Sequence, residues 1–315
     1  MSFSHKVKDE LAGVIPNARH CQIAEIAALI SMVGNIVTGY RGRLFIRFST
    51  ENRVVVCKCQ TLIRKAFSYT AECGVRYNRE TGTTTYILSV SNHEVAEKIL
   101  LATKLMDVDG SINGDFALTS TMGISSQCCK RAYLRGSFLA GGSISDPEKS
   151  YHFEIVSSGM DKAVQIADTM KVYELDARIV ERRNSYVVYI KEGAQIVDML
   201  NVMEARISLM ELENMRVVKE VRNSVNRKFN CEMANLSKTV NAAVKQIEDI
   251  EYIRDKVGLD YLDENLEEIA NLRLQYSEMS LKDLGEMLSV PVGKSGVNHR
   301  LRKISQIAEE LRKRN

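Results

Sequence analysis

The chain contains no tryptophan and only three prolines among its 315 residues. It also lacks any apolar run of the roughly 18 residues that a membrane-spanning helix needs. Its N-terminus carries charges but no continuous apolar segment, so we expect no secretion signal and no membrane partner. The apolar fraction of 45% is ordinary for a globular protein, and the length favours about two domains.

The cysteines are few and scattered, and their number is odd. No Cys-x-x-Cys pair occurs, so the local spacing of a zinc-binding motif is absent. Scattered thiols are typical of proteins in a reducing cytoplasm, where most serve as small core residues. We therefore predict a cytoplasmic protein with no cofactor and no bound metal. The seven cysteines are Cys21, Cys57, Cys59, Cys73, Cys128, Cys129 and Cys231.

The chain also lacks a large excess of either charge, because its formal net charge is only +3. The charges are nevertheless segregated along the chain. Basic residues dominate from Arg216 to Lys245, and acidic residues dominate from Glu248 to Glu268. Such segregation indicates separate surfaces for separate partners. Alternating solvated helix faces are the plainer alternative, above all for the acidic block.

The stretch Ser280–Arg314 has the most specific chemical pattern in the chain. Ser280 precedes an apolar helical stripe as an N-cap residue, and Asp283 favours the same helix start. Val290-Pro291 and Gly293 then end that helix, because the residue before a proline is pushed out of the α region. The stripe consists of Leu281, Leu284 and Leu288.

A second helix follows this break, and its apolar positions recur at helical spacing. They are Val297, Leu301, Ile304, Ala308 and Leu311. Two short helices joined by a tight turn, with the second basic on its outer side, predict a helix-turn-helix at about residues 279–312.

The outer side of the second helix has the chemistry of a DNA-reading surface. Cationic side chains meet phosphates or guanine edges, and short polar side chains hydrogen-bond to base edges. The expected DNA-binding residues are Lys294, Ser295, Gly296, Asn298, His299, Arg300, Arg302 and Lys303. The terminal residues Arg312, Lys313 and Arg314 are expected to help hold phosphates. An ordinary helical hairpin with a solvated basic face is the alternative.

The first two thirds of the chain repeat one order of elements: helix, two strands, helix, two strands, helix. The repeats span about residues 20–106 and 125–203, and we predict a duplicated α+β unit with antiparallel sheets. Only helices are expected after Ala205, with a junction at Asn226–Leu236. The predicted domains are an N-terminal helix (1–19), the duplicated domain (20–205), a linker helix (206–230) and an all-α C-terminal domain (231–315).

One segment of each repeat resembles the LAGLIDADG helix of a homing-endonuclease family. The segments are IAALISMVG, ending at Gly34, and LRGSFLAGG, ending at Gly142. The resemblance implies two helices packed through small residues, with saddle-shaped sheets that lie across DNA.

The resemblance also implies an acidic metal ligand just before the final glycine of each segment. Val33 and Gly141 stand at these positions, and neither can ligate Mg²⁺, which requires oxygen donors. We therefore expect a degenerate site and no catalysis. A replacement acid such as Asp107, Asp109 or Glu154 is left open as an alternative.

The strands of the first repeat carry a set of basic residues that favour a second DNA-contacting surface. A merely solvated sheet face, or a platform for docking another protein, explains the same residues. They are Arg41, Arg43, Arg47, Arg76 and Arg79.

The whole chain resembles the WhiA family of bacterial regulators. The resemblance rests on SFSHKVKDEL at the N-terminus, both degenerate repeats, the segment NRKFNCEMANLSKTV and the C-terminal GKSGVNHRLRKI. It implies a nucleoid-associated protein that binds double-stranded DNA and regulates transcription. It also implies a role in sporulation or in cell division and chromosome segregation, and a C-terminal domain like region 4 of sigma factors.

The leading hypothesis is thus a non-catalytic, sequence-specific DNA-binding regulator that is a monomer in solution. The partner proteins expected from the resemblance are a sigma factor, RNA polymerase or another regulator. The first alternative is a metal-dependent DNA endonuclease with displaced ligands. The sequence does not favour it, because the acidic pair that such an enzyme needs is absent from the two motif segments. The second is an interaction protein that binds a sigma factor or regulator and scarcely touches DNA.

Overall fold

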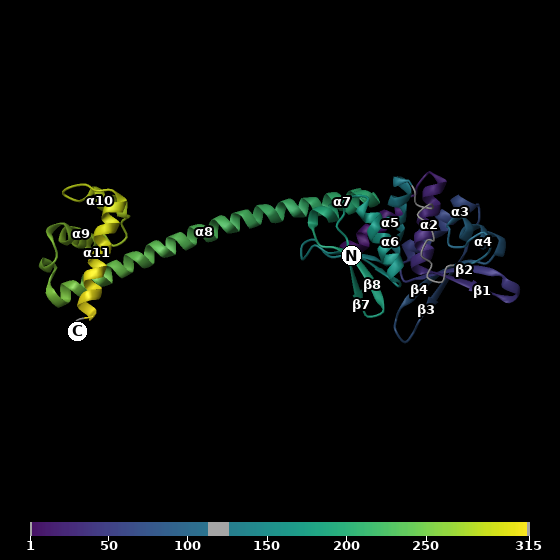
Figure 1. Ribbon diagram of the computed structural model, residues 1–315, viewed down its shortest axis with the longest axis horizontal. Helices are drawn as coiled ribbons and strands as arrows, with labels where there is room; N and C mark the ends of the chain where they lie inside the picture. Colours follow the sequence, from purple (N-terminus) through teal and green to yellow (C-terminus); the bar gives the residue numbers. More distant parts are fainter. Residues whose placement is uncertain (1, 113–125, 314–315) are drawn as a thin grey trace. The chain divides into compact units, whose positions relative to one another are not determined.

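The computed structural model describes residues 2–112 and 126–313, with the side chain of Arg41 excepted. The chain forms two compact units, Met1–Lys219 and Glu220–Asn315. Figure 1 labels their helices and strands. Arg314, one of the expected phosphate contacts, lies outside the described residues.

The N-terminal unit confirms the predicted duplication, because the same order of elements occurs twice. A short helix, α1 (Phe3–Gly13), precedes the first repeat. The first repeat consists of α2 (Arg19–Val33), β1 (Gly34–Thr38), the 3₁₀ turn η1 (Tyr40–Gly42), β2 (Leu44–Thr50), α3 (Arg53–Phe67), β3 (Glu72–Tyr77), β4 (Thr84–Val90) and α4 (His93–Ala102). The second consists of α5 (Gln127–Gly141), β5 (Gly142–Ile144), β6 (Phe153–Ser157), α6 (Met160–Lys171), β7 (Arg178–Arg182), β8 (Ser185–Ile190) and α7 (Gly193–Met203).

Each repeat contains one four-stranded antiparallel sheet, and the two sheets have the same strand order. The orders are β1-β2-β4-β3 and β5-β6-β8-β7. Because side chains alternate across a strand, one face of each sheet is apolar and buried. Ile46 pairs with Val90 in the first sheet, and Ile155 pairs with Val188 in the second; all four side chains are buried. The fold is therefore α+β, as the alternation of elements predicts.

The helices α2 and α5 pack against each other at the centre of the N-terminal unit (Figure 1). A Cβ atom at Gly136 would lie only 2.8 Å from the backbone oxygen of Glu25 and 2.9 Å from the Cβ of Ala28. Ala27 and Ala28 are buried as well. Small residues thus allow the two helix backbones to approach closely, as the LAGLIDADG resemblance implies.

A buried ionic network crosses this helix pair. Glu25 on α2 is fully buried and pairs with Lys58 on α3 and with Arg135 on α5. Arg135 also donates to Glu204 at 2.6 Å, and the Lys58 ammonium donates to the backbone oxygen of Leu11 at 2.6 Å. Burial lowers the pKa of Lys58 to about 8. Since an unpaired charge is very costly in a core, these groups depend on one another.

The C-terminal unit consists of helices and their connections, with no strand among its described residues. Its elements are the second part of α8 (Arg206–Val257), η3 (Leu259–Tyr261), α9 (Glu264–Gln275), α10 (Leu281–Glu286) and α11 (Lys294–Lys313). Its core combines one or more apolar side chains from each α-helix, among them Ile250, Ile253, Ile269, Leu284, Leu301 and Ile304.

The junction predicted at Asn226–Leu236 is wrong. The segment lies inside α8, which is one helix of 52 residues. It contains neither proline nor glycine, the two residues that interrupt helices most strongly. Its apolar residues Phe229, Met233 and Leu236 also recur at helical spacing. Asparagine and polar composition alone are therefore too weak to end a helix here.

None of the helices in the described residues is long and apolar enough to cross a membrane.

Candidate nucleic-acid interface

The first helix of the predicted helix-turn-helix begins as its sequence indicates. The hydroxyl of Ser280 accepts a hydrogen bond from the backbone N–H of Asp283 at 3.3 Å and donates to its carboxylate at 2.8 Å. This arrangement satisfies one of the free N–H groups that open every helix. The N-cap prediction for α10 is confirmed.

The turn between α10 and α11 depends on a glycine that the sequence analysis did not single out. A Cβ atom at Gly285 would lie 2.1 Å from the backbone oxygen of Val292, so the turn packs directly on the α10 backbone. The N–H of Val292 donates to the oxygen of Gly285 at 3.1 Å. A side chain at Gly285 would push the turn away from α10. The close packing of the turn on α10 therefore requires glycine at this position.

A carboxylate on α9 also forms hydrogen bonds to this turn. Glu268 accepts hydrogen bonds from the backbone N–H of Ser289 at 2.6 Å and from its hydroxyl at 3.1 Å. Glu268 belongs to the acidic block whose sequence favours mere solvation. This residue instead positions the turn, and no local pattern could reveal a contact between residues 21 positions apart.

The inner side of α11 is buried as predicted. Val297, Leu301, Ile304 and Ala308 are each at most 1% exposed, and Leu311 is half-buried against the same core. This stripe determines which side of α11 faces solvent, because helical residues three or four apart share a face.

The outer side of α11 presents the expected DNA-binding residues. Lys294, Ser295, His299, Arg302 and Lys303 are exposed, and Gly296, Asn298 and Arg300 are half-buried.

The outer residues differ in whether they already have partners. The side chains of Lys294, His299 and Arg302 have no hydrogen-bond or ion-pair partner among the described residues. Lys303 forms an exposed ion pair with Asp263 at 3.3 Å, which is a weak interaction in water. One guanidinium nitrogen of Arg300 is buried and has no hydrogen-bond partner within the part of the chain that the structure describes. Most of these groups are therefore available to a ligand.

Arg312 has a different environment from the one expected for a phosphate contact. Its guanidinium donates to the buried carboxylate of Asp249 at 2.7 Å and lies over the ring of Tyr252 at 4.7 Å. The ion pair fastens the end of α11 to α8 within the C-terminal unit. Lys313 remains exposed.

The basic residues of the first repeat are brought together in part. Arg47 pairs with Ser89 and Arg76 pairs with Thr85, and both partners lie on β4 four residues apart. Since residues two or four apart share a face of a strand, Arg47 and Arg76 project from the same outer face. Arg43 and Arg79 are exposed at strand ends. The Arg41 side chain lies outside the described residues.

Val33 and Gly141, the positions at which the resemblance implies metal ligands, are the last residues of α2 and α5. A Cβ atom at Gly141 would lie 2.6 Å from the backbone oxygen of Val156, so this position has no room for a carboxylate. Nearby, the Lys162 ammonium donates to the backbone oxygen of Ser31 at 2.7 Å.

Two of the three acids considered as replacements have other partners, Glu154 and Asp109. Glu154 accepts from Ser143 at 3.0 Å and contacts His152 at 3.1 Å, and Asp109 accepts from Ser111 at 2.7 Å. Among the described residues, no three carboxylate, histidine or cysteine groups cluster at the ends of α2 and α5 that carry Val33 and Gly141.

Three family models match consecutive parts of the chain. The WhiA N-terminal LAGLIDADG-like domain matches residues 19–106, the WhiA LAGLIDADG-like domain matches residues 130–222, and the WhiA C-terminal HTH domain matches residues 225–308.

Similar proteins align over nearly the whole chain. A protein of Lachnoclostridium phytofermentans named "Probable cell division protein WhiA" is 48% identical over 99% of this chain and 100% of its own length. A protein of the same name from Thermoanaerobacter pseudethanolicus is 46% identical over 100% of this chain and 99% of its own.

A solved structure shares the fold from end to end. The crystal structure of full-length DUF199/WhiA from Thermatoga maritima is 26% identical, with a TM-score of 0.60, and the match covers 98% of this chain and 99% of that one. The duplicated α+β unit, the helix-turn-helix and these full-length matches together place the chain in the WhiA family.

Proposed function

We propose that this protein is a non-catalytic, sequence-specific DNA-binding regulator of bacterial transcription, and that α11 reads the major groove. The observation that carries the proposal is the outer side of α11, the second helix of a helix-turn-helix, where Lys294, His299 and Arg302 have no partner among the described residues. The major groove, about 12 Å wide, accepts a helix of this kind.

The residues of this side divide into two roles. Asn298, His299 and Arg302 read bases, because Asn pairs with adenine and Arg with guanine through two hydrogen bonds each. Lys294, Arg300 and Lys303 contact the backbone.

Cell division and chromosome segregation form the biological setting that we propose, because the relatives carry the name of a cell division protein. A role in sporulation is the second setting. In either case the protein acts at chromosomal DNA in the cytoplasm. Arg47 and Arg76 of the N-terminal unit form a second DNA-contacting face in this scheme.

The experiment selects binding sites from a random double-stranded DNA library with the purified full-length protein and sequences the retained molecules. Affinity for the selected site is then compared with affinity for a scrambled site. Arg302→Ala should cost roughly 1–3 kcal/mol on the selected site and relax preference at one position. Lys294→Ala should weaken both sites alike and lower the salt slope by about one unit.

Lys256→Ala, a change of one exposed lysine in the last turn of α8, is the matched control and should leave binding unchanged. A library that yields no enriched site would contradict sequence-specific binding. An interaction protein that scarcely touches DNA would show a shallow salt slope, because it neutralises few phosphates.

A further inference from the structure

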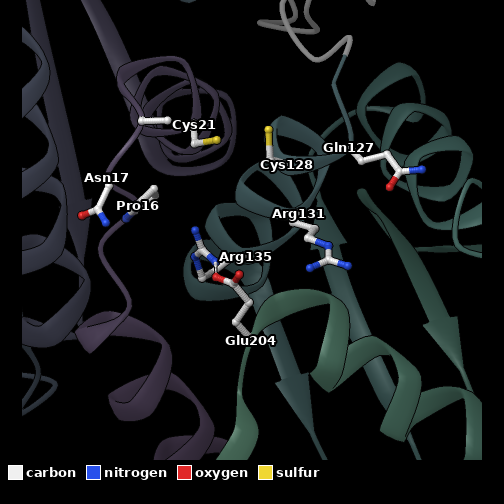
Figure 2. A pocket seen from close by; sticks show the side chains of 9 residues that line it. Pro16, Asn17, Cys21, Gln127, Cys128, Arg131, Arg135 and Glu204 are labelled. Carbon is white, nitrogen blue, oxygen red and sulfur yellow. Dashed lines mark hydrogen bonds and ion pairs between the residues drawn. The ribbon is translucent and has the colours of Figure 1, made fainter.

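A second feature of the N-terminal unit lies at the beginning of the α2–α5 helix pair. His20 and Cys21 are in the first turn of α2, and Cys128 and Cys129 are in the first turn of α5. His20 and Cys128 are 108 positions apart in the chain. The side chains of Cys21 and Cys128 project from the two helices toward a common pocket (Figure 2).

The four side chains converge closely. The Nδ1 atom of His20 lies 3.1 Å from the sulfur of Cys129, 3.4 Å from that of Cys21 and 4.0 Å from that of Cys128. All four ligand atoms lie within 4.8 Å of one another. Three sulfur atoms and an imidazole nitrogen therefore occupy the corners of one small volume.

We propose that His20, Cys21, Cys128 and Cys129 bind a single Zn²⁺ ion that joins the two repeats. Three thiolates and one imidazole form a standard ligand set for structural zinc, whereas Mg²⁺ and Ca²⁺ select oxygen.

The distances agree with this assignment. Tetrahedral zinc at about 2.3 Å from sulfur and about 2.1 Å from nitrogen separates its ligand atoms by about 3.5–3.8 Å. The observed nitrogen–sulfur distances of 3.1, 3.4 and 4.0 Å lie on both sides of this range. The most distant pair of atoms has to close by about 1 Å, which rotation of a cysteine side chain supplies.

The surroundings hold the backbone on both sides of the site. The hydroxyl of Tyr173 donates to the backbone oxygen of Gln127 at 2.7 Å, immediately before the two cysteines of α5. The side chain of Gln22 donates to the backbone oxygen of Pro16 at 2.8 Å and fixes the segment that enters α2. Such contacts around a site orient ligands before the ion arrives.

Local electrostatics favour the occupied state. Zinc with three thiolates and a neutral imidazole carries a net charge of −1. The first turns of two helices supply partial positive charge to that complex. Arg131, which lines the same pocket, adds a full positive charge nearby.

An entry path is present. A pocket of about 490 Å³ adjoins the site and is lined by Cys21 and Cys128, among others. His20 and Cys128 are exposed, while Cys21 and Cys129 are buried, so an ion can reach the cluster from solvent. The ligands also come as one adjacent pair from each repeat, so the ion would fasten the two helix starts together.

This assignment departs from the sequence analysis, which expects no metal. Zinc motifs are normally recognised by short spacings within one segment. Here each segment contributes only two neighbouring ligands, and the fold brings the pairs together. The proposal is independent of DNA binding.

The test measures the metal content of the full-length protein, purified under reducing conditions without chelator. We expect one zinc per chain that survives gel filtration. Replacement by Co²⁺ should produce the sulfur-to-cobalt charge-transfer bands and intense visible bands of a tetrahedral site.

Variants then locate the site. Cys128→Ser changes an exposed thiol with little risk to folding, and it should abolish stable binding, as should Cys129→Ser. His20→Cys should keep zinc because it retains four ligands, whereas His20→Ala should lose it. Cys57→Ser and Cys231→Ser, which change exposed cysteines outside the cluster, should keep full metal content.

Several results would overturn the proposal. One is a protein that remains free of metal after zinc addition and gel filtration. Another is zinc that Cys128→Ser and Cys129→Ser retain as well as the wild type does. A disulfide within the cluster under reducing conditions, or the visible absorbance of an iron–sulfur cluster in the purified protein, would assign the four residues to different chemistry.

Discussion

The two ends of the α2–α5 helix pair differ in whether they carry side chains that can bind a metal. At the C-terminal ends, Val33 and Gly141 replace the acids that the LAGLIDADG resemblance implies, and Gly141 has no room for a side chain. At the N-terminal ends, a histidine and three cysteines converge. Val33 and Gly141 are separated by the same 108 positions as His20 and Cys128. Equivalent positions of the two repeats thus lie at the same end of each helix: His20 and Cys128 at the start, Val33 and Gly141 at the finish.

The helix scaffold and the site that it carries are therefore separable. Packing of the two helices depends on small residues and on a buried ionic network, and neither needs a metal ligand at either end. One end can therefore lose its ligands while the pair keeps its geometry. The end that has donor atoms on both helices becomes a site by virtue of that same geometry.

The largest expected effect comes from the ionic network between the two ends. Glu25→Gln would leave Lys58 and Arg135 without their shared carboxylate in the core, at an expected cost of about 3–5 kcal/mol in the free energy of unfolding. Urea unfolding of the full-length protein measures it. Glu204→Gln is the matched control and should cost much less, because this side chain is 39% exposed. Equal effects of the two changes would show that Glu25 is not the centre of the network.

A smaller loss is expected from overpacking the helix pair. Gly136→Leu places a side chain where even a Cβ atom lies 2.8 Å from the Glu25 backbone. The expected cost is about 1–3 kcal/mol, seen as a lower melting temperature. Gly13→Ala adds an atom where nothing lies within 4 Å and serves as the control. An unchanged melting temperature for Gly136→Leu would mean that the two helices do not meet at this position.

No effect is expected in a test for DNA cleavage, which concerns the C-terminal ends of α2 and α5. The protein should not nick supercoiled plasmid with Mg²⁺ or Mn²⁺, because Val33 and Gly141 offer no oxygen ligand from their side chains. Gel electrophoresis of the plasmid measures it. Nicking that copurifies with the protein and disappears in Glu154→Ala or Asp109→Ala would support the endonuclease with displaced ligands.

Much of the fold follows from local pattern. The repeated order of helices and strands and the buried stripe of α11 agree with what the residues predict. These features depend on periodicities of 2 and 3.6 residues, which are visible within a single segment of the sequence. The prediction at Asn226–Leu236 is wrong because polar residues are compatible with a helix that proline and glycine do not interrupt.

Which distant residues meet depends on how the elements pack in three dimensions. The contact of Glu268 with Ser289, the approach of Gly285 to Val292 and the pairing of Glu25 with Arg135 each join separate elements. The same holds for His20 and Cys21 with Cys128 and Cys129. That each helix begins with two side chains able to bind a metal can be read directly from the residues. Only the packing of α2 on α5 places them within 4.8 Å, because that distance depends on where two backbones cross and not on the spacing within either.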